Sequence, residues 1–184
     1  MMAKQYGFYF DADRCVLCRA CEVACKAVNN IGRGIKWIRV VETWGGVYPN
    51  ITRAFFALAC MHCSKPTCIE ACPTRAISKR DRDGIVVIDR DKCIGCDGCR
   101  ECFSACPYSV PQFGEDGIME MCDFCTGLNI APACAVCCPT EALKFGYLDD
   151  LLEMAKGKAT RRMGGPTEPS VIIAGELPVA SLIT

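Results

Sequence analysis

The chain has 184 residues, a formal net charge of zero and eighteen cysteines. This length suits one domain, or two small domains that share a core. Because the charges balance and no basic stripe dominates, the composition disfavours binding to nucleic acid. The longest notable apolar run, Ala54–Met61, is much shorter than the roughly 20 residues that a membrane-spanning helix needs. We therefore expect no direct membrane span.

The cysteines are the dominant feature of the composition. About one residue in ten is cysteine, a density that in a short secreted chain indicates a disulfide scaffold. The opening segment, MMAKQYGFYF, lacks the basic and apolar pattern of a signal peptide. The cysteines also form four tight groups, whereas disulfide partners are usually spread over several elements. We therefore expect metal-binding thiols rather than disulfides.

The first group follows a short aromatic segment. Tyr6–Asp11 alternates in character and is predicted to be a strand. Motif one then spans Cys15–Cys25, with gaps of two, two and three residues, and a helix is predicted over Arg19–Asn29. The insertion that follows, residues 31–59, contains two predicted strands, Ile35–Val41 and Thr52–Ala59. Turn residues separate these two strands.

The insertion contains both tryptophans, Trp37 and Trp44. They are typical either of an aromatic core in a small sheet or of a docking surface over a cluster, and the core interpretation is favoured. Motif two follows, spanning Cys60–Cys72 with gaps of two, four and three residues before Pro73. His62 lies inside it. Because four thiolates are present without it, we expect His62 to be a hydrogen-bonding loop residue that can tune a cluster, not a ligand.

Motif three follows the predicted strand Ile85–Ile88 and spans Cys93–Cys106, ending before Pro107. The spacing C-x2-C-x2-C-x3-C-P folds three thiolates around one [4Fe–4S] cluster and sends the fourth to a second cluster. Two-residue gaps allow a tight loop to reach three corners of a cluster. A cysteine four positions further on lies on the same helical face, one turn along. Proline then ends the helix.

Motif four spans Cys122–Cys138, with gaps of two, eight and three residues. The segments CPTRAI and CPTEAL recur after motifs two and four, and DRCVLC resembles DKCIGC. This repetition indicates two ferredoxin-like modules. A short helix is predicted over Asp149–Lys158. From Ala159 the tail is polar and rich in glycine and proline before the β-branched Val171–Ile173, so we expect it to lie along a partner or along the module surface.

Four clusters need sixteen thiolates, so two of the eighteen cysteines are spare. Cys137 is one, because Cys134 and Cys138 keep the terminal spacing of the other motifs. The second is Cys93 or Cys102. If Cys93 is spare, the ligands keep gaps of two, two and three residues; they are Cys96, Cys99, Cys102 and Cys106. If Cys102 is spare, the ligands keep the short link from the preceding strand; they are Cys93, Cys96, Cys99 and Cys106.

The fourth cysteine of each motif serves the partner cluster, so the motifs must be paired. Nesting predicts motif two with three, and motif one with four; pairing one with two and three with four is the alternative. The inner clusters then take Cys60, Cys63, Cys68 and Cys106, and Cys72 with Cys96, Cys99 and either Cys102 or Cys93. The outer clusters take Cys15, Cys18, Cys21 and Cys138, and Cys25, Cys122, Cys125 and Cys134.

The four motifs in order, the segment CMHCSKPTC at residues 60–68, the segment CPYSVPQ at residues 106–112 and the long gap in motif four carry a family resemblance. Over residues 6–147 the chain resembles the four-cluster iron–sulfur subunits of molybdopterin oxidoreductases of the dimethyl sulfoxide reductase superfamily. The extra cysteine step in motif three departs from that pattern.

The resemblance implies an α+β fold of two pseudo-symmetric ferredoxin-like modules with a β-rich insertion and an extended C-terminal tail. We expect an outer module of residues 1–30 and 115–150, an inner module of residues 60–114, and a short helix and tail over residues 151–184. It also implies four [4Fe–4S] clusters, a large catalytic subunit with a molybdenum or tungsten bis-pterin site, and often a membrane anchor subunit that reacts with quinone.

The expected function is electron transfer without a catalytic site of its own. Single electrons would pass between the catalytic subunit and a quinone-reactive subunit or soluble redox partner. Lys26, Lys65, Arg75 and Arg100 lie beside expected ligands and are candidates for raising cluster potentials. The alternatives are a freestanding polyferredoxin and a structural zinc protein. Localisation is expected to be cytoplasmic, or exported in the folded state with a partner that bears a twin-arginine signal.

Overall fold

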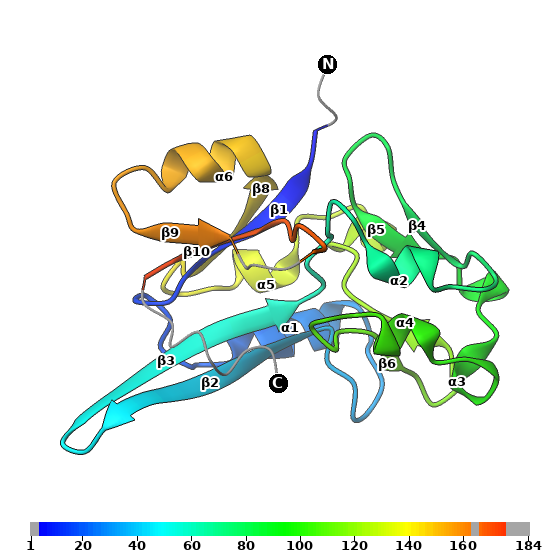
Figure 1. Cartoon of the computed structure of the whole chain (residues 1–184), viewed down its shortest axis with the longest axis horizontal. Helices are drawn as coiled ribbons and strands as arrows, with labels where there is room; N and C mark the ends of the chain where they lie inside the picture. Colours follow the sequence, from blue (N-terminus) through cyan, green and yellow to red (C-terminus); the bar gives the residue numbers. More distant parts are fainter. Residues whose placement is uncertain (1–3, 163–165, 176–184) are drawn as a thin grey trace.

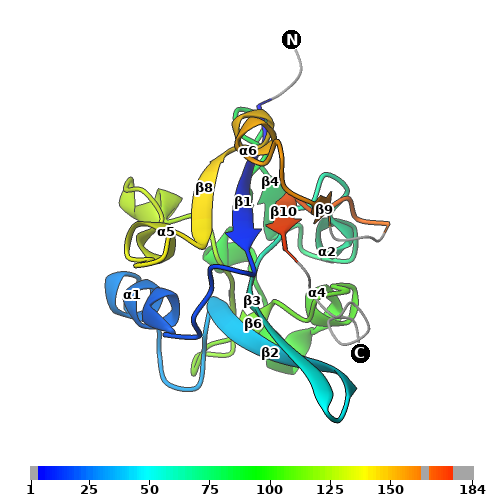
Figure 2. The ribbon, with the colours of Figure 1, turned by 90° about the vertical axis from the view of Figure 1, so that its left-hand side faces the viewer.

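A four-stranded sheet forms the centre of the molecule. The computed structural model describes residues 4–162 and 166–175. The strand order is β8-β1-β10-β9, which Figure 2 shows across the sheet. β1 pairs antiparallel with β8 and parallel with β10. The four strands are β1 (Tyr6–Asp11), β8 (Leu143–Tyr147), β9 (Thr160–Arg162) and β10 (Val171–Ala174).

Aromatic residues of β1 face both sides of this sheet. Phe8 and Phe10 enter the main core, where Phe10 packs edge-to-face on Phe56 with ring centroids 5.4 Å apart. Tyr9 points to the other face, which helix α6 (Leu148–Met154) covers, as Figure 1 shows. The strand predicted over Tyr6–Asp11 is therefore present, with alternate residues directed to opposite faces. The predicted helix over Asp149–Lys158 is shorter, since regular helix ends at Met154.

The C-terminal segment was expected on the surface or on a partner, and this expectation was wrong for residues 171–174. β10 lies between β1 and β9, and Val171, Ile172 and Ile173 are exposed by 3% or less. Four consecutive apolar residues are typical of a strand buried on both faces. The last part of the expected tail, residues 176–184, lies outside the described residues.

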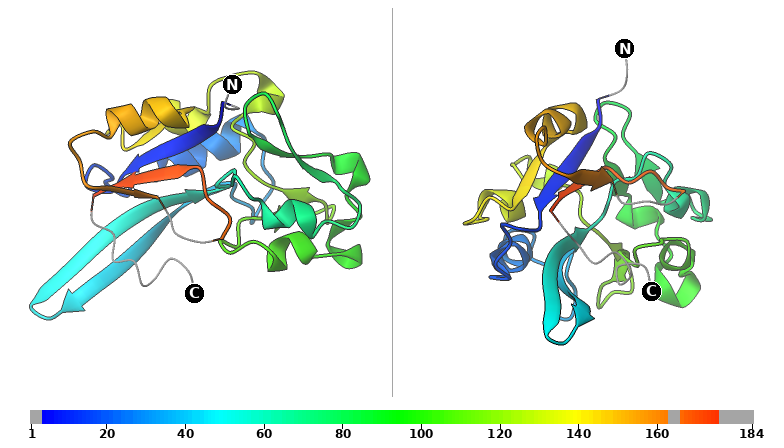
Figure 3. Two further views of the ribbon diagram at one scale, coloured as in Figure 1. Left: turned by 45° about the horizontal axis from the view of Figure 1, so that its top comes forward. Right: turned by 60° about the vertical axis from the view of Figure 1, so that its left-hand side comes forward.

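The insertion forms a long hairpin of β2 (Ile38–Val47) and β3 (Asn50–Ala59), which projects from the body in Figures 1 and 3. Gly46 lies between the two predicted strands, but it pairs with Ile51 within the ladder. Its φ is +77°, and a Cβ there would lie 2.1 Å from the Asn50 carbonyl oxygen, so only glycine fits. Both strands therefore extend further toward the tip than predicted.

The two tryptophans of the hairpin differ in their surroundings. Trp37 packs against the core and donates from Nε1 to Glu120 Oε2 at 3.0 Å. Trp44 is 60% exposed. Its neighbours toward the tip, Val47 and Tyr48, are exposed to a greater degree. The interpretation of both tryptophans as a sheet core was therefore wrong for Trp44.

Two-stranded ribbons and short helices make up the rest of the molecule. The ribbons are β4 (Ile77–Lys79) with β5 (Val86–Ile88) and β6 (Gln112–Phe113) with β7 (Met119–Glu120). The cysteine motifs carry α1 (Ala20–Val28), α2 (Thr67–Glu70), α3 (Gly95–Gly98), α4 (Glu101–Ser104) and α5 (Ala133–Val136). Single turns of 3-10 helix cover Arg90–Lys92 and Thr126–Leu128.

The fold is thus a mixture of small sheets and short helices, as expected for an α+β chain. Within the described part of the chain, no helix combines the length and apolar character needed to cross a bilayer.

Candidate metal centres

Each motif places two cysteines one helical turn apart. A cysteine occupies the second position of α1, α2, α4 and α5, and another follows four residues later; the pairs are Cys21 and Cys25, Cys68 and Cys72, Cys102 and Cys106, and Cys134 and Cys138. Side chains four residues apart on a helix have Cβ atoms about 5–6 Å from each other. Helix α1 contains both of its cysteines, whereas in the other three motifs the second cysteine lies two residues beyond the end of the helix.

Site A gathers the first three thiols of motif one and the last of motif four. They line a small void together with Phe10 and Leu143. Leu17, which precedes Cys18, has a φ of 56° and directs its backbone N–H to the Cys15 sulfur. Burial raises the pKa of the Cys21 thiol to about 12. The thiols of site A are Cys15, Cys18, Cys21 and Cys138.

Site B is the most buried group, with thiol residues exposed by only 3–6%. Asn29 Nδ2 lies 3.7 Å from the Cys25 sulfur and 3.6 Å from the Cys125 sulfur, so one amide joins motifs one and four. Burial, and then the nearby thiols of Cys25 and Cys125, raise the pKa of Cys134. The thiols of site B are Cys25, Cys122, Cys125 and Cys134.

Site C joins the first three thiols of motif two to the last of motif three, around a void that Met121 and Thr167 also line. Thr167 is 1% exposed; it shares a 3.0 Å hydrogen bond with the Tyr108 hydroxyl and also bonds to the Cys63 thiol. Lys79 Nζ donates to the Cys63 carbonyl at 2.7 Å. The thiols of site C are Cys60, Cys63, Cys68 and Cys106.

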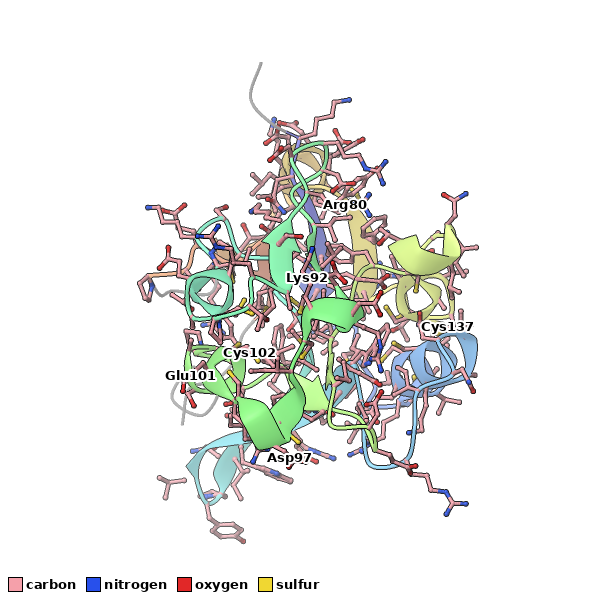
Figure 4. The ribbon with its side chains drawn as sticks, turned by 90° about the vertical axis from the view of Figure 1, so that its right-hand side faces the viewer. Arg80, Lys92, Asp97, Glu101, Cys102 and Cys137 are labelled. Atoms are coloured by element: carbon pink, nitrogen blue, oxygen red, sulfur yellow. The ribbon has the colours of Figure 1, made fainter. Side chains whose placement is uncertain are left out.

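Site D lies beneath the turn formed by α3 and α4, on the face that Figure 4 presents. Ile77, Phe113 and Met119 line its void together with four thiols. Cys96, which the sequence placed among the ligands, does not line this void. The thiols of site D are Cys72, Cys93, Cys99 and Cys102.

The repeated Cys-Pro-Thr segments place matching hydrogen bonds on two thiols. The Cys72 sulfur lies 3.6 Å from the Thr74 hydroxyl, and the Cys138 sulfur lies 3.8 Å from the Thr140 hydroxyl. Burial alone would raise the pKa of both thiols, but these contacts and several backbone N–H groups lower it below the usual value. Hydrogen bonds to sulfur are one of the means by which a protein adjusts an iron–sulfur cluster.

His62 lies in the interior between sites B and C. Its φ is 41°, it is fully buried, and its Nδ1 accepts a 3.0 Å hydrogen bond from the Val86 amide. The ring stacks on Phe124, with centroids 4.0 Å apart. Burial lowers the pKa of His62 to about 3, so the ring is neutral, and because Nδ1 accepts, the proton is on Nε2.

Two of the four expected tuning cations are held by other groups. Lys26 Nζ donates to the Ile35 carbonyl at 3.2 Å, and Lys65 pairs with Glu168 at 2.5 Å. Arg100 lies over the Phe113 ring at 5.2 Å, beside site D. Arg75 is an exposed residue in the left-handed region (φ 54°) between Thr74 and β4.

Lys79 was not identified from the sequence, although its charge acts on the thiols of Cys63 and Cys60. Burial lowers its pKa, and these thiols oppose that change. No local pattern links Lys79 to motif two. By contrast, Thr74 and Thr140 were visible in the repeated CPT segments.

The donor sets fit iron–sulfur clusters. Each site offers four sulfurs, and burial raises the pKa of most of these thiols because a bare thiolate is costly in an apolar interior. Iron supplies the charge that stabilises buried thiolates. Among the described residues, no three His, Cys, Asp or Glu side chains stand close enough to hold a single metal ion. Sites A, C and D instead surround voids.

The chain matches two families of iron–sulfur domain. A 4Fe-4S dicluster domain matches residues 51–148, and a 4Fe-4S binding domain matches residues 6–27. Together these two segments contain every cysteine of the sequence.

Curated relatives are similar over most of the sequence. The B subunit of anaerobic dimethyl sulfoxide reductase from Escherichia coli (strain K12) is 39% identical over 162 residues, 82% of this chain and 77% of the relative. This protein belongs to the family of iron–sulfur subunits of dimethyl sulfoxide reductase-type complexes. Within this family, the thiosulfate reductase electron transfer subunit PhsB of Salmonella typhi is also 39% identical, over 81% of this chain and 79% of the relative. The dimethyl sulfoxide reductase B subunit of Haemophilus influenzae is 38% identical over 80% of this chain and 77% of the relative.

Members of this family are iron–sulfur electron-transfer subunits rather than catalytic subunits of their complexes. The expectation from the sequence that this chain is an electron-transfer subunit is thereby confirmed.

Proposed function

We propose that the chain carries four [4Fe–4S] clusters, one at each of sites A to D, and conducts single electrons through a larger reductase complex. The observation that carries the proposal is the gathering of sixteen thiols into four sets of four, drawn crosswise from paired motifs. When bound, each cluster takes up and releases one electron at a time. The chain's residues hold the clusters close together, shield them and adjust their potentials.

The helices arrange the four sites in the order A, B, C, D. Helix α1, and helix α5 with the turn after it, each give one thiol to site A and one to site B; α2 and α4, each with its following turn, do the same for sites C and D. Sites B and C are close at Cys60 and Cys122, since burial and then the Cys122 thiol raise the pKa of Cys60. The stacked rings of His62 and Phe124 lie in the same region. We expect an electron to pass from one cluster to the next in this order.

Two pseudo-symmetric modules are part of the proposal. In the outer module Asp11 N donates to the Ala142 carbonyl at 2.8 Å, and in the inner module Asp89 N donates to the Ala76 carbonyl at 2.7 Å. The residues after the two Cys-Pro-Thr segments, Arg75 and Glu141, both have φ near 50°. These matching contacts support a repeated unit of two antiparallel strands and two helices.

The names of the relatives indicate which partners this chain has. One relative is named as the B subunit of dimethyl sulfoxide reductase and another as the electron transfer subunit of thiosulfate reductase. We therefore assign substrate chemistry to a large catalytic partner with a molybdenum or tungsten bis-pterin site. A quinone-reactive membrane subunit, or a soluble redox protein, would exchange electrons at the other end of the series of clusters.

The test is the metal content of the complex, purified anaerobically from its source without removing partners. We expect about sixteen irons per chain and about one molybdenum or tungsten. About sixteen irons with no heavier metal, on a chain that migrates alone, would instead indicate a freestanding polyferredoxin. A total near eight irons would contradict the count of four clusters.

A further inference from the structure

Motif three offers five cysteines to a pair of sites that need four from it. We propose that Cys96 is a free thiol and that site D uses Cys93, Cys99 and Cys102 from this motif, with Cys72 from motif two. The inference rests on the proposed function and assigns the ligands of one of its clusters. It also differs from both sets that the sequence left open, each of which used Cys96.

Cys102 is placed at site D by its helix. It occupies the second position of α4, as Cys21 does in α1 and Cys68 does in α2. Its side chain is 8% exposed and packs with Ile77 and Met119. Burial, and then the thiols of Cys99, Cys93 and Cys72, raise its pKa to about 11, and all four cysteines line the same void.

Cys93 is placed at site D by the strand before it. Strand β5 ends at Ile88, and one 3-10 turn, begun by the Asp89 side chain accepting from the Asp91 amide, leads directly to Cys93. Cys93 packs against the same apolar cluster as Cys102. Cys15 is reached in the same way, by a short turn after β1.

The choice between Cys96 and Cys99 depends on the α3 turn. Gly95 has a φ of +76°, so the loop before Cys96 resembles the loops before Cys18, Cys63 and Cys125, where a thiol enters a site. Here, however, the Cys96 amide donates to the Gly117 carbonyl at 2.8 Å, and the sulfur lies 3.4 Å from the position that a Gly117 Cβ would take. Cys99 is extended, with φ −167° and ψ 139°, and lines the void.

The surroundings of the two sulfurs differ. The Cys99 sulfur accepts from the Glu101 amide at 3.4 Å, as the Cys122 sulfur accepts from the Phe124 amide at 3.5 Å. The Cys96 sulfur instead faces an oxygen of the Asp97 carboxylate, at 4.0 Å. Asp97 projects at the rim of the α3 turn in Figure 4.

Cys137 shows the same pattern as Cys96. Its sulfur donates to the Cys134 carbonyl at 3.5 Å, and Figure 4 shows it far from the α3 turn. Without Cys96 and Cys137, the eighteen cysteines leave the sixteen thiols that four clusters require.

The first experiment is alkylation of the cluster-loaded full chain, purified anaerobically, with iodoacetamide and mapping by mass spectrometry. We expect Cys96 to be labelled while Cys93, Cys99 and Cys102 remain unlabelled until the clusters are removed. Labelling of Cys99 with protection of Cys96 would overturn the proposal. Cys137 is the internal comparison, since it is the other proposed free thiol.

The second experiment counts iron in single variants, with electron paramagnetic resonance to identify the affected cluster. Cys96→Ser should keep the wild-type iron content and spectrum, whereas Cys99→Ser should lose up to about four of about sixteen irons. Cys93→Ser and Cys102→Ser should behave like Cys99→Ser. Iron loss in Cys96→Ser, or full retention in Cys99→Ser, would contradict the assignment. A wild-type chain that itself binds far fewer than sixteen irons would refute the proposed function instead.

Discussion

The half of the molecule that contains sites A and B and the half that contains sites C and D hold their thiols by different means. In the first half a four-stranded sheet supports the motifs, and the thiols of site B are almost fully buried. In the second half two-stranded ribbons of two or three residues a strand support them, and most thiols remain partly exposed.

This difference indicates that the two halves are stabilised by different means, one more by apolar packing and the other more by bound clusters. The sheet half contributes a large share of the main apolar core, including Phe10 and Phe56, whereas the cluster centred on the ribbons, with Ile77, Val86 and Met119, is much smaller. An isolated two-stranded ribbon is at best marginally stable in water. The ribbon half therefore depends more on its bound clusters, since metal binding contributes directly to folding where a site is not otherwise formed.

The largest expected effect concerns the way in which motifs one and four share thiols between sites A and B. Cys25→Ser changes motif one, but its sulfur belongs to site B, so we expect the cluster of the motif-four thiols to be lost or altered, with up to about four irons missing. Iron analysis and electron paramagnetic resonance measure this. A change confined to the motif-two cluster would support the alternative pairing of motifs one and two.

Chelation should reveal how strongly burial protects site B. With an iron chelator under anaerobic conditions, we expect about four irons to leave last, from site B, because its thiol residues are exposed by only 3–6%, whereas most thiols of the other three sites are partly exposed. Alkylation during the time course, mapped by mass spectrometry, identifies the thiols released. Early labelling of Cys122 or Cys134 would contradict this order.

The core of the sheet half should tolerate little change. Phe56→Ala removes a fully buried ring that packs on Phe10, and we expect a loss of about 3–5 kcal/mol of stability. Thermal unfolding followed by circular dichroism measures it. Leu152→Ala, at a side chain that is 41% exposed, is the control and should change stability by about 0.5 kcal/mol or less. Equal losses in both variants would contradict a core centred on Phe56.

An ion pair with Lys158 joins Asp11 of β1 to the segment after α6, and the charge of Asp11 makes the stability of the fold depend on pH. Burial alone would raise the pKa of Asp11, but the hydrogen bond and charge of Lys158 lower it below the usual value. The ion pair therefore stabilises the fold above the ordinary Asp pKa of about 4, and this contribution is lost as pH falls through the lowered value.

Without Lys158, burial dominates and the native pKa of Asp11 rises. Lys158→Met should therefore lower the melting temperature most at pH 8, and the deficit should shrink as pH falls to 5. Lys156→Met, at an exposed pair with Glu153, is the control. A deficit that grows toward acid would contradict the assignment.

The smallest effect is expected at the hairpin tip. Trp44→Ala removes a ring that is 60% exposed, so stability should change by about 0.5 kcal/mol or less. Thermal unfolding of the isolated cluster-loaded chain measures it. A loss comparable to that of Phe56→Ala would show that the tip packs on the body.

Local signals were sufficient for much of the fold. Aromatic alternation predicted the strand at Tyr6–Asp11, and the helix predicted over Arg19–Asn29 is present as Ala20–Val28. The pairing of β10 with β1 joins residues more than 160 positions apart, and no local pattern reports such a contact. Polar, glycine-rich flanks also made the tail resemble a surface segment.

For the sites too, local patterns were informative and contacts between distant segments were not. Spacing alone led us to expect groups of thiols at sites A, B and C, because each fourth cysteine is one helical turn from the third. It left Cys93 and Cys102 as alternatives and kept both Cys96 and Cys99, because spacing carries no information about which way the α3 turn directs a side chain. Lys79 and Thr167 reach site C from distant segments, so spacing carries no information about them.

The strand β10 has a consequence for biosynthesis. Just before it, Ser170 N donates to the Met61 carbonyl, and the amides of Ser64 and Lys65 donate to the carbonyls of Glu168 and Thr167. Residues 167–174 are translated after all four motifs. They complete the central sheet and also hold the loop of site C by backbone hydrogen bonds. A ribosome-bound chain that ends before residue 167 lacks both features. Cluster loading of site C in its final form is therefore a step that follows translation of all four motifs.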